Sequence, residues 1–159
     1  MCGIFGCISP INEASSEVLE GLRKLEYRGY DSAGLAAIFP GHEGPIETER
    51  TTGYVSDLVS KANGRFRGAR ISIGHTRWAT HGGVTDSNAH PHTSNDGTIT
   101  IVHNGIIENA SELQERVENL GYSIKSDTDS ELFVHLFHHE LNSQAASCTP
   151  LDAFSSAVN

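Results

Sequence analysis

The sequence has 159 residues, 37% of them hydrophobic, which is enough for one domain with a hydrophobic core. No apolar run approaches the about 20 residues of a membrane-spanning helix, and the first residues lack the features of a signal peptide, so we expect a soluble, cytoplasmic protein without a membrane partner. The formal net charge of −9 disfavours nucleic acid and anionic lipid surfaces as partners.

The first six residues, Met-Cys-Gly-Ile-Phe-Gly, place a cysteine directly after the initiator methionine. Because Cys2 is small, Met1 can be removed, which leaves one residue with both a thiol and an α-amino group. The thiolate is the nucleophile, and an amine with a reference pKa of about 7.7–8.0 can act as its base near neutral pH. This pattern is compatible with a catalytic Cys2, but taken alone it favours the alternative, a cysteine without a chemical role.

Hydrophobic periodicity predicts strands and helices in the first half of the chain, with Ser15 or Ser16 capping the first helix. The predicted elements are a strand over Ile4–Ile8, a helix over Ser15–Tyr27, a buried strand over Ala33–Phe39 and a helix over Val55–Ala62 that ends at Asn63.

Two further strands are predicted over Ile71–His75 and Thr98–His103. The segment between them, Thr76–Gly97, is rich in Gly, His, Asn, Asp, Ser and Thr. A loop of this length inside a compact domain is usually functional or disordered. Its mixture of Arg, Trp and His favours a functional loop.

The second half of the chain predicts mainly helices. The patterns Ser111–Gln114 and Thr128–Glu131 are typical of capping boxes that open helices. The predicted inward-facing residues are Leu113, Val117 and Leu120 in the first helix and Phe133, Leu136, Phe137 and Leu141 in the second. A short strand is expected over Tyr122–Lys125.

A last helix is predicted from Thr149-Pro150, with a periodic face of Leu151, Phe154 and Val158. The sequence stops at Asn159 in the middle of this pattern, so we expect a truncated domain.

Six short motifs occur in order along the chain. They are Met1–Gly6, Leu25–Gly34 (Leu-Glu-Tyr-Arg-Gly-Tyr-Asp-Ser-Ala-Gly), Gly74–Gly82 (Gly-His-Thr-Arg-Trp-Ala-Thr-His-Gly), Asn88–His92 (Asn-Ala-His-Pro-His), His103–Asn109 (His-Asn-Gly-Ile-Ile-Glu-Asn) and Ser126–Glu131 (Ser-Asp-Thr-Asp-Ser-Glu). Together they resemble the glutaminase domain of the glutamine–fructose-6-phosphate aminotransferases, a class II glutamine amidotransferase domain. The amidophosphoribosyltransferases of purine synthesis resemble the second and third motifs less closely.

The resemblance implies that Cys2 attacks the side-chain amide of glutamine, forming a γ-glutamyl thioester and releasing ammonia. It assigns the oxyanion hole to the side-chain N–H of Asn104 and the backbone N–H of Gly105. Losing one such donor typically costs about 10²–10³ in rate. Asn-Gly is also a strong hairpin-turn signal, and both interpretations can hold together.

Glutamine carries an α-carboxylate and an α-ammonium, so its pocket needs one charge of each sign. By resemblance, the Arg77 guanidinium binds the carboxylate in a bidentate manner, assisted by the Thr80 hydroxyl and the His81 backbone. Asp129 resembles the partner of the α-ammonium. An Asp in the first turn of a helix is otherwise ordinary, because it favours the helix dipole.

Trp78 is expected to cover the site and exclude water, and in the family it lies on a loop that closes over glutamine. The alternative is a core tryptophan. Arg28 and the loop Gly29–Asp31 match positions close to the N-terminal cysteine, so we expect them to support the site. His90 matches a histidine of the family's active-site region without a role that its chemistry predicts.

Two alternatives are kept open. Nine histidines could indicate a metal enzyme, but no cysteine pair or carboxylate triad supports one, and the three cysteines, Cys2, Cys7 and Cys148, are odd in number and lack metal spacing. We therefore expect neither a metal nor a cofactor. The second alternative is a module that binds glutamine without turning it over.

The resemblance implies an α+β fold, the N-terminal-nucleophile hydrolase sandwich with layers in the order αββα. Residues 1–159 are expected to form a glutaminase domain that is incomplete at its C-terminus and lacks the sugar isomerase domains. L-glutamine is the expected partner, fructose 6-phosphate would bind to the absent domains, and the parent enzymes are expected to be homo-oligomers.

Overall fold

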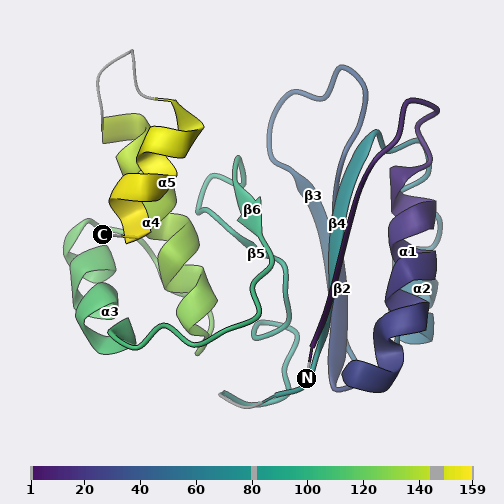
Figure 1. Cartoon of the computed structure of the whole chain (residues 1–159), viewed down its shortest axis with the longest axis horizontal. Helices are drawn as coiled ribbons and strands as arrows, with labels where there is room; N and C mark the ends of the chain where they lie inside the picture. The colour runs from purple at the N-terminus through teal and green to yellow at the C-terminus, as the bar shows by residue number, and fades with distance from the viewer. Residues whose placement is uncertain (1, 80–81, 144–148, 159) are drawn as a thin grey trace.

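Two antiparallel sheets lie between two groups of helices, which gives four layers in the order αββα (Figure 1). The computed structural model describes residues 2–79, 82–143 and 149–158. The elements in chain order are β1 (Gly3–Ile8), α1 (Ala14–Leu25), a 3-10 helix (Glu26–Arg28), β2 (Ser32–Ile38), β3 (Glu47–Thr52), α2 (Val55–Ala62), β4 (Ile71–Arg77), β5 (His92–Thr93), β6 (Thr100–Ile101), α3 (Ala110–Asn119), α4 (Asp129–Ser143) and α5 (Pro150–Val158). The layer order confirms the expected α+β sandwich.

The larger sheet has the strand order β1-β4-β2-β3, and all of its neighbouring strands are antiparallel. The register pairs Gly3 with Thr76 and Ser32 with Arg77. The beginning of β1, the beginning of β2 and the end of β4 therefore meet at the same end of the sheet. The N-terminus lies at this end of the sheet in Figure 1.

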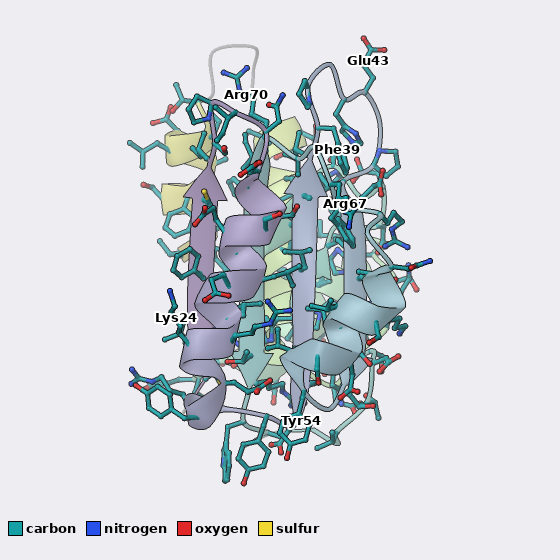
Figure 2. The ribbon with its side chains drawn as sticks, turned by 90° about the vertical axis from the view of Figure 1, so that its right-hand side faces the viewer. Lys24, Phe39, Glu43, Tyr54, Arg67 and Arg70 are labelled. Carbon is teal, nitrogen blue, oxygen red and sulfur yellow. The ribbon has the colours of Figure 1, made fainter. Side chains whose placement is uncertain are left out.

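Helices α1 and α2 cover one face of the larger sheet, and Figure 2 shows them side by side in front of it. Their apolar faces supply Val18, Leu22 and Leu58, each fully buried. Gly74 of β4 faces α1, and a Cβ there would come within 2.7 Å of Val18. Because side chains alternate along a strand, His75 and Arg77 face the other way, toward the second sheet.

Helices α3, α4 and α5 form the outer layer beyond β5 and β6 (Figure 1). Their apolar core contains Val117, Leu132, Leu136 and Ala157. No helix in the described ranges is long and apolar enough to cross a membrane.

Several expected details of the secondary structure are wrong. The expected strand Thr98–His103 is reduced to Thr100–Ile101, and Tyr122–Lys125 forms no strand. The Tyr122 ring stacks on His135 of α4, and the Lys125 N–H is bonded by the Glu131 carboxylate. Strands β3 and β5 were not predicted, because β3 is polar throughout and β5 has two residues within the long loop.

The expected helix caps also differ. Helix α1 begins at Ala14, so Ser15 lies inside it, and its hydroxyl bonds the Phe66 carbonyl instead. Helix α3 begins at Ala110, one residue before Ser111. Glu131 bonds the backbone N–H groups of Lys125 and Ser126, so the second capping box does not form.

The apolar face of α5 is turned differently from the prediction. Ala153 and Ala157 are buried, while Leu151 and Val158 are 73% and 57% exposed. Small side chains allow α5 to pack closely on α4, and periodicity of the large residues alone did not indicate this.

Candidate active site

A cavity of about 120 Å³ opens where β1 and β4 meet the segment after β6. Five separate parts of the chain line it. The lining residues are Cys2, His75, Arg77, Trp78, His90, His103, Asn104, Gly105, Thr128, Asp129 and Ser130. Seven of the residues expected from the sequence to form or support the site therefore lie together.

Cys2 is held by the pairing of β1 with β4. The Gly3 N–H donates to the Thr76 hydroxyl at 3.2 Å, and the Trp78 N–H lies 3.3 Å from Cys2 Sγ. Cys2 is partly exposed, so its thiol is open to a substrate in the cavity. The contact with the Trp78 N–H fixes the position of the sulfur beside the cavity.

The loop Gly29–Asp31 packs directly on the end of β4. A Cβ at Gly29 would lie 2.7 Å from the backbone carbon of Arg77, which explains why a glycine stands there. The Asp31 N–H donates to the Arg77 carbonyl at 3.0 Å, and its carboxylate accepts from the Ala79 N–H at 2.7 Å. This loop therefore holds the chain on both sides of Trp78.

Trp78 lies at the rim of the cavity and is 41% exposed, so the core-tryptophan alternative is wrong. Its ring meets Tyr30 edge to face at a centroid distance of 5.2 Å. Arg28 belongs to the 3-10 helix before this loop and does not line the cavity.

Arg77 is the cation of the cavity and is 5% exposed. Its Nη1 donates to the Gly83 carbonyl at 3.0 Å, which fixes the guanidinium in the wall. Thr80 and His81, the expected assistants of Arg77, lie outside the described residues.

Asn104 and Gly105 follow β6 and reach back to the N-terminus. The Asn104 side-chain NH₂ donates to the Cys2 carbonyl at 3.1 Å. A Cβ at Gly105 would lie 2.6 Å from His103 Nε2, so the chain passes too close to that ring for a side chain. Strand β6 pairs with β5 before it, so Asn104-Gly105 is not a hairpin turn.

Asp129 is the first residue of α4 and places a carboxylate in the cavity wall. One oxygen accepts from the Ile107 N–H at 2.7 Å, and the other accepts from the Ser130 hydroxyl at 3.2 Å. These bonds fix its position, and a carboxylate has further lone pairs for a cationic ligand.

Three buried histidines form a stack behind the cavity. The ring centroids of His75 and His90 are 4.3 Å apart, and those of His90 and His92 are 4.5 Å apart. Burial lowers the pKa of His75 to about 4 and that of His92 to about 3. Burial, together with the neighbouring His75, also holds the pKa of His90 well below its usual range. All three rings are therefore neutral at pH 7.

Four further residues line the cavity, although local sequence predicted no role for them: His75, His103, Thr128 and Ser130. For His75 a signal existed, because it shares a face of β4 with Arg77. For the others, the deciding contacts are non-local: His103 bonds the Ser130 hydroxyl, and Thr128 bonds His92.

The long polar loop is anchored by buried polar groups. Asn88 is fully buried, and its amide bonds the Gly83 carbonyl and both the carboxylate and the backbone N–H of Asp127. Arg50 of β3 donates to the Ser87 and Ala89 carbonyls. These bonds join the loop to β3 and to the segment before α4.

No group of three or more His, Cys, Asp or Glu side chains in the described part of the chain is placed to hold a metal ion. The cavity instead combines a thiol, a guanidinium, a carboxylate and amide donors. Such a set can bind a zwitterion and stabilise an oxyanion beside a nucleophile.

Comparisons with known proteins agree with this chemistry. Residues 75–150 match the family described as a glutamine amidotransferase domain. Glutamine–fructose-6-phosphate aminotransferases of Pyrococcus horikoshii and Pseudomonas syringae pv. tomato are each 50% identical to this chain over 141 residues. These alignments cover 89% of this chain, but only 23% and 22% of the two relatives. The chain thus spans less than a quarter of the length of these relatives.

Solved structures show the same fold. The glutamine phosphoribosylpyrophosphate amidotransferase of B. subtilis superposes with a TM-score of 0.77 at 24% identity, over 99% of this chain and 32% of its own. An allosteric regulatory enzyme of purine biosynthesis gives a TM-score of 0.79, with the same identity and coverage. These matches confirm the N-terminal-nucleophile fold.

Proposed function

We propose that this chain, which belongs to the glutamine amidotransferases and is homologous to the glutaminase part of the glutamine–fructose-6-phosphate aminotransferases, hydrolyses the side-chain amide of L-glutamine with Cys2 as nucleophile. One observation carries the proposal. Cys2, Arg77, Asn104 and Asp129 are far apart in the sequence but line one cavity.

In the first step the Cys2 thiol loses its proton and the sulfur attacks the amide carbon of glutamine. The Asn104 side chain and the Gly105 backbone N–H would stabilise the oxyanion that forms. The C–N bond then breaks, ammonia leaves with the proton, and a γ-glutamyl thioester remains. Water hydrolyses this thioester to glutamate and restores the thiol.

The two charges of the cavity support glutamine as the substrate. Arg77 would bind the α-carboxylate and Asp129 the α-ammonium, which orients the side-chain amide toward Cys2. Trp78 at the rim would cover the bound substrate, and Arg28, behind the Gly29–Asp31 loop, would support it indirectly. The buried His90 would form part of the wall.

The base for the thiol is assigned to the α-amino group of Cys2 after removal of Met1. With Met1 present, that nitrogen would be an amide and could not accept a proton. Activity should therefore depend on N-terminal processing.

We further assign residues 1–159 to the glutaminase part of such an enzyme. In a longer protein of this family, the released ammonia would convert fructose 6-phosphate to glucosamine 6-phosphate on other domains, within a homo-oligomer. The 50% identity to enzymes named for this reaction supports that assignment over the phosphoribosylpyrophosphate enzymes, which match at 24%.

The test is glutamate release from glutamine, with the N-terminal mass measured in the same sample. Cys2→Ala should abolish release while glutamine still binds, measured by calorimetry. Cys7→Ala is the matched control, because Cys7 lies on the same strand but packs against the core under α1 and α2.

Glutamate release that survives Cys2→Ala would contradict the assignment of the nucleophile. Glutamine binding without release by the folded wild-type chain, with Met1 removed, would instead show a binding module.

A further inference from the structure

We propose that His75 is a positioning residue that orients the Asn104 side-chain amide, so that its NH₂ group faces the Cys2 side of the cavity. This inference rests on the proposed function, because it assigns a support to the proposed oxyanion hole. His75 itself need not touch the substrate's reacting atoms.

His75 stands near the end of β4 and is 1% exposed. Its Nε2 lies 3.2 Å from Asn104 Oδ1. Its Nδ1 is buried and has no hydrogen-bond partner among the described residues. The ring is also held by its stack on His90, whose backbone carbonyl packs against Gly34 of β2. The His75 ring is therefore fixed in place. Asn104, in contrast, lies in the segment after the two-residue strand β6.

The contacts of the ring select one tautomer. Burial keeps His75 neutral, since it lowers the pKa to about 4 against the opposing effects of the Asn104 amide and the His103 carbonyl. A neutral imidazole carries one N–H. On Nε2 this N–H donates to Asn104 Oδ1, whereas Nδ1 is buried and makes no hydrogen bond within the described residues. The Nε2–H form is thus the one that the surroundings favour.

The same contact selects the orientation of the Asn104 amide. With Oδ1 taken by His75, the NH₂ group points toward Cys2 and donates to its carbonyl at 3.1 Å. A reversed amide would place its oxygen against the Cys2 carbonyl and its NH₂ against the His75 N–H. A primary amide has two N–H donors, so one remains for the oxyanion while the other holds the Cys2 carbonyl.

The test compares His75→Leu, which removes the donor, with His75→Gln, whose amide can restore an N–H near Nε2. His75→Leu should lower kcat for glutamate release by about 10–100-fold, less than the loss of an oxyanion donor itself. Its KM should stay within about twofold, because the contact acts on the transition state. His75→Gln should recover most of the lost kcat.

A double-mutant cycle separates positioning from general stability. In an Asn104→Ala background, His75→Leu should cause little further loss, because the group on which it acts has gone. Alkylation of Cys2 by iodoacetamide creates no oxyanion, so its rate in His75→Leu should match the wild type. Additive losses, or a His75→Gln variant as poor as His75→Leu, would overturn the proposal.

A measurement without turnover keeps the inference separate from the proposed function. Nitrogen-15 NMR of the wild-type chain should show His75 as the Nε2–H tautomer, with its Nε2 resonance shifted in Asn104→Ala. A Nδ1–H tautomer would overturn the inference even if glutamine is hydrolysed. Absence of glutamate release together with the Nε2–H tautomer would contradict only the function, and the structural role of His75 would stand.

Discussion

The backbone N–H of Trp78 lies 3.3 Å from the sulfur of Cys2, across the end of the β1–β4 pair. The two residues are 76 positions apart in the sequence, and the antiparallel register brings them together. One strand pairing therefore sets the positions of both the proposed nucleophile and the residue at the cavity rim. Changes that move the chain after β4 should affect the thiol as well as the rim.

Asp31→Ala tests this coupling. The mutation removes the acceptor of the Ala79 N–H, and a hydrogen bond to a charged group contributes about 1.5–3 kcal/mol. We expect glutamine turnover to fall by about tenfold or more, along with a lower Tm. Steady-state kinetics and thermal melts measure the two effects.

Asp57→Ala is the matched control, because its carboxylate also accepts a backbone N–H, that of Tyr54 at the start of α2, outside the cavity. It should lower Tm without lowering kcat. Equal losses of kcat in both variants would show that Asp31 acts only through stability.

Arg77→Lys should raise the KM for glutamine by about tenfold or more, because a point charge replaces a two-pronged donor that is fixed in the wall. Arg70→Lys, at an exposed position just before β4, serves as the control. An unchanged KM in Arg77→Lys would contradict the proposal that Arg77 binds the α-carboxylate of glutamine.

Gly34→Ala should prevent stable folding, because a Cβ there would overlap the backbone carbonyl of His90. Gly6→Ala is the matched substitution on another strand of the same sheet, where the nearest atom of Ile73 is 3.6 Å away. We expect a cooperative thermal transition for Gly6→Ala and a loss of soluble, folded Gly34→Ala. Normal melting of Gly34→Ala would show that the loop containing His90 can move away from β2.

Stability should fall as pH falls below about 6.5, because His75, His90 and His92 stay neutral in the fold while the unfolded chain takes up protons. The folded pKa values are lower than the unfolded ones, so the unfolded state binds more protons between about pH 6.5 and 4. Each such histidine lowers the free energy of unfolding by up to about 1.4 kcal/mol for each pH unit of acidification in this window.

Denaturant unfolding between pH 7 and 5.5 measures this slope before most carboxylates titrate. His92→Gln should reduce the slope, since it removes one of the three groups. A free energy of unfolding that does not change over this range would contradict the buried, neutral state of the stack.

Part of the site was predictable because it depends on residue type and order. Cys2 next to the initiator methionine, Arg77 beside Trp78, and Asn104 beside Gly105 are patterns that local sequence carries. The same holds for α1 and α2, whose apolar periodicity matches the helices observed. Glycine and asparagine at helix ends were equally informative, as the left-handed Asn63 shows.

Other features depend on contacts between distant segments, and no local pattern indicates them. The sequence by itself determined the reactive groups, the strongly periodic helices and the family. Only the tertiary structure decided that Asn88 and three histidines are buried, that α5 turns its alanines inward, and that the Asn104 amide lies between His75 and Cys2. The physical reason is that burial, tautomer and amide orientation are set by which neighbours surround a group, and strand register and helix packing bring those neighbours from far along the chain.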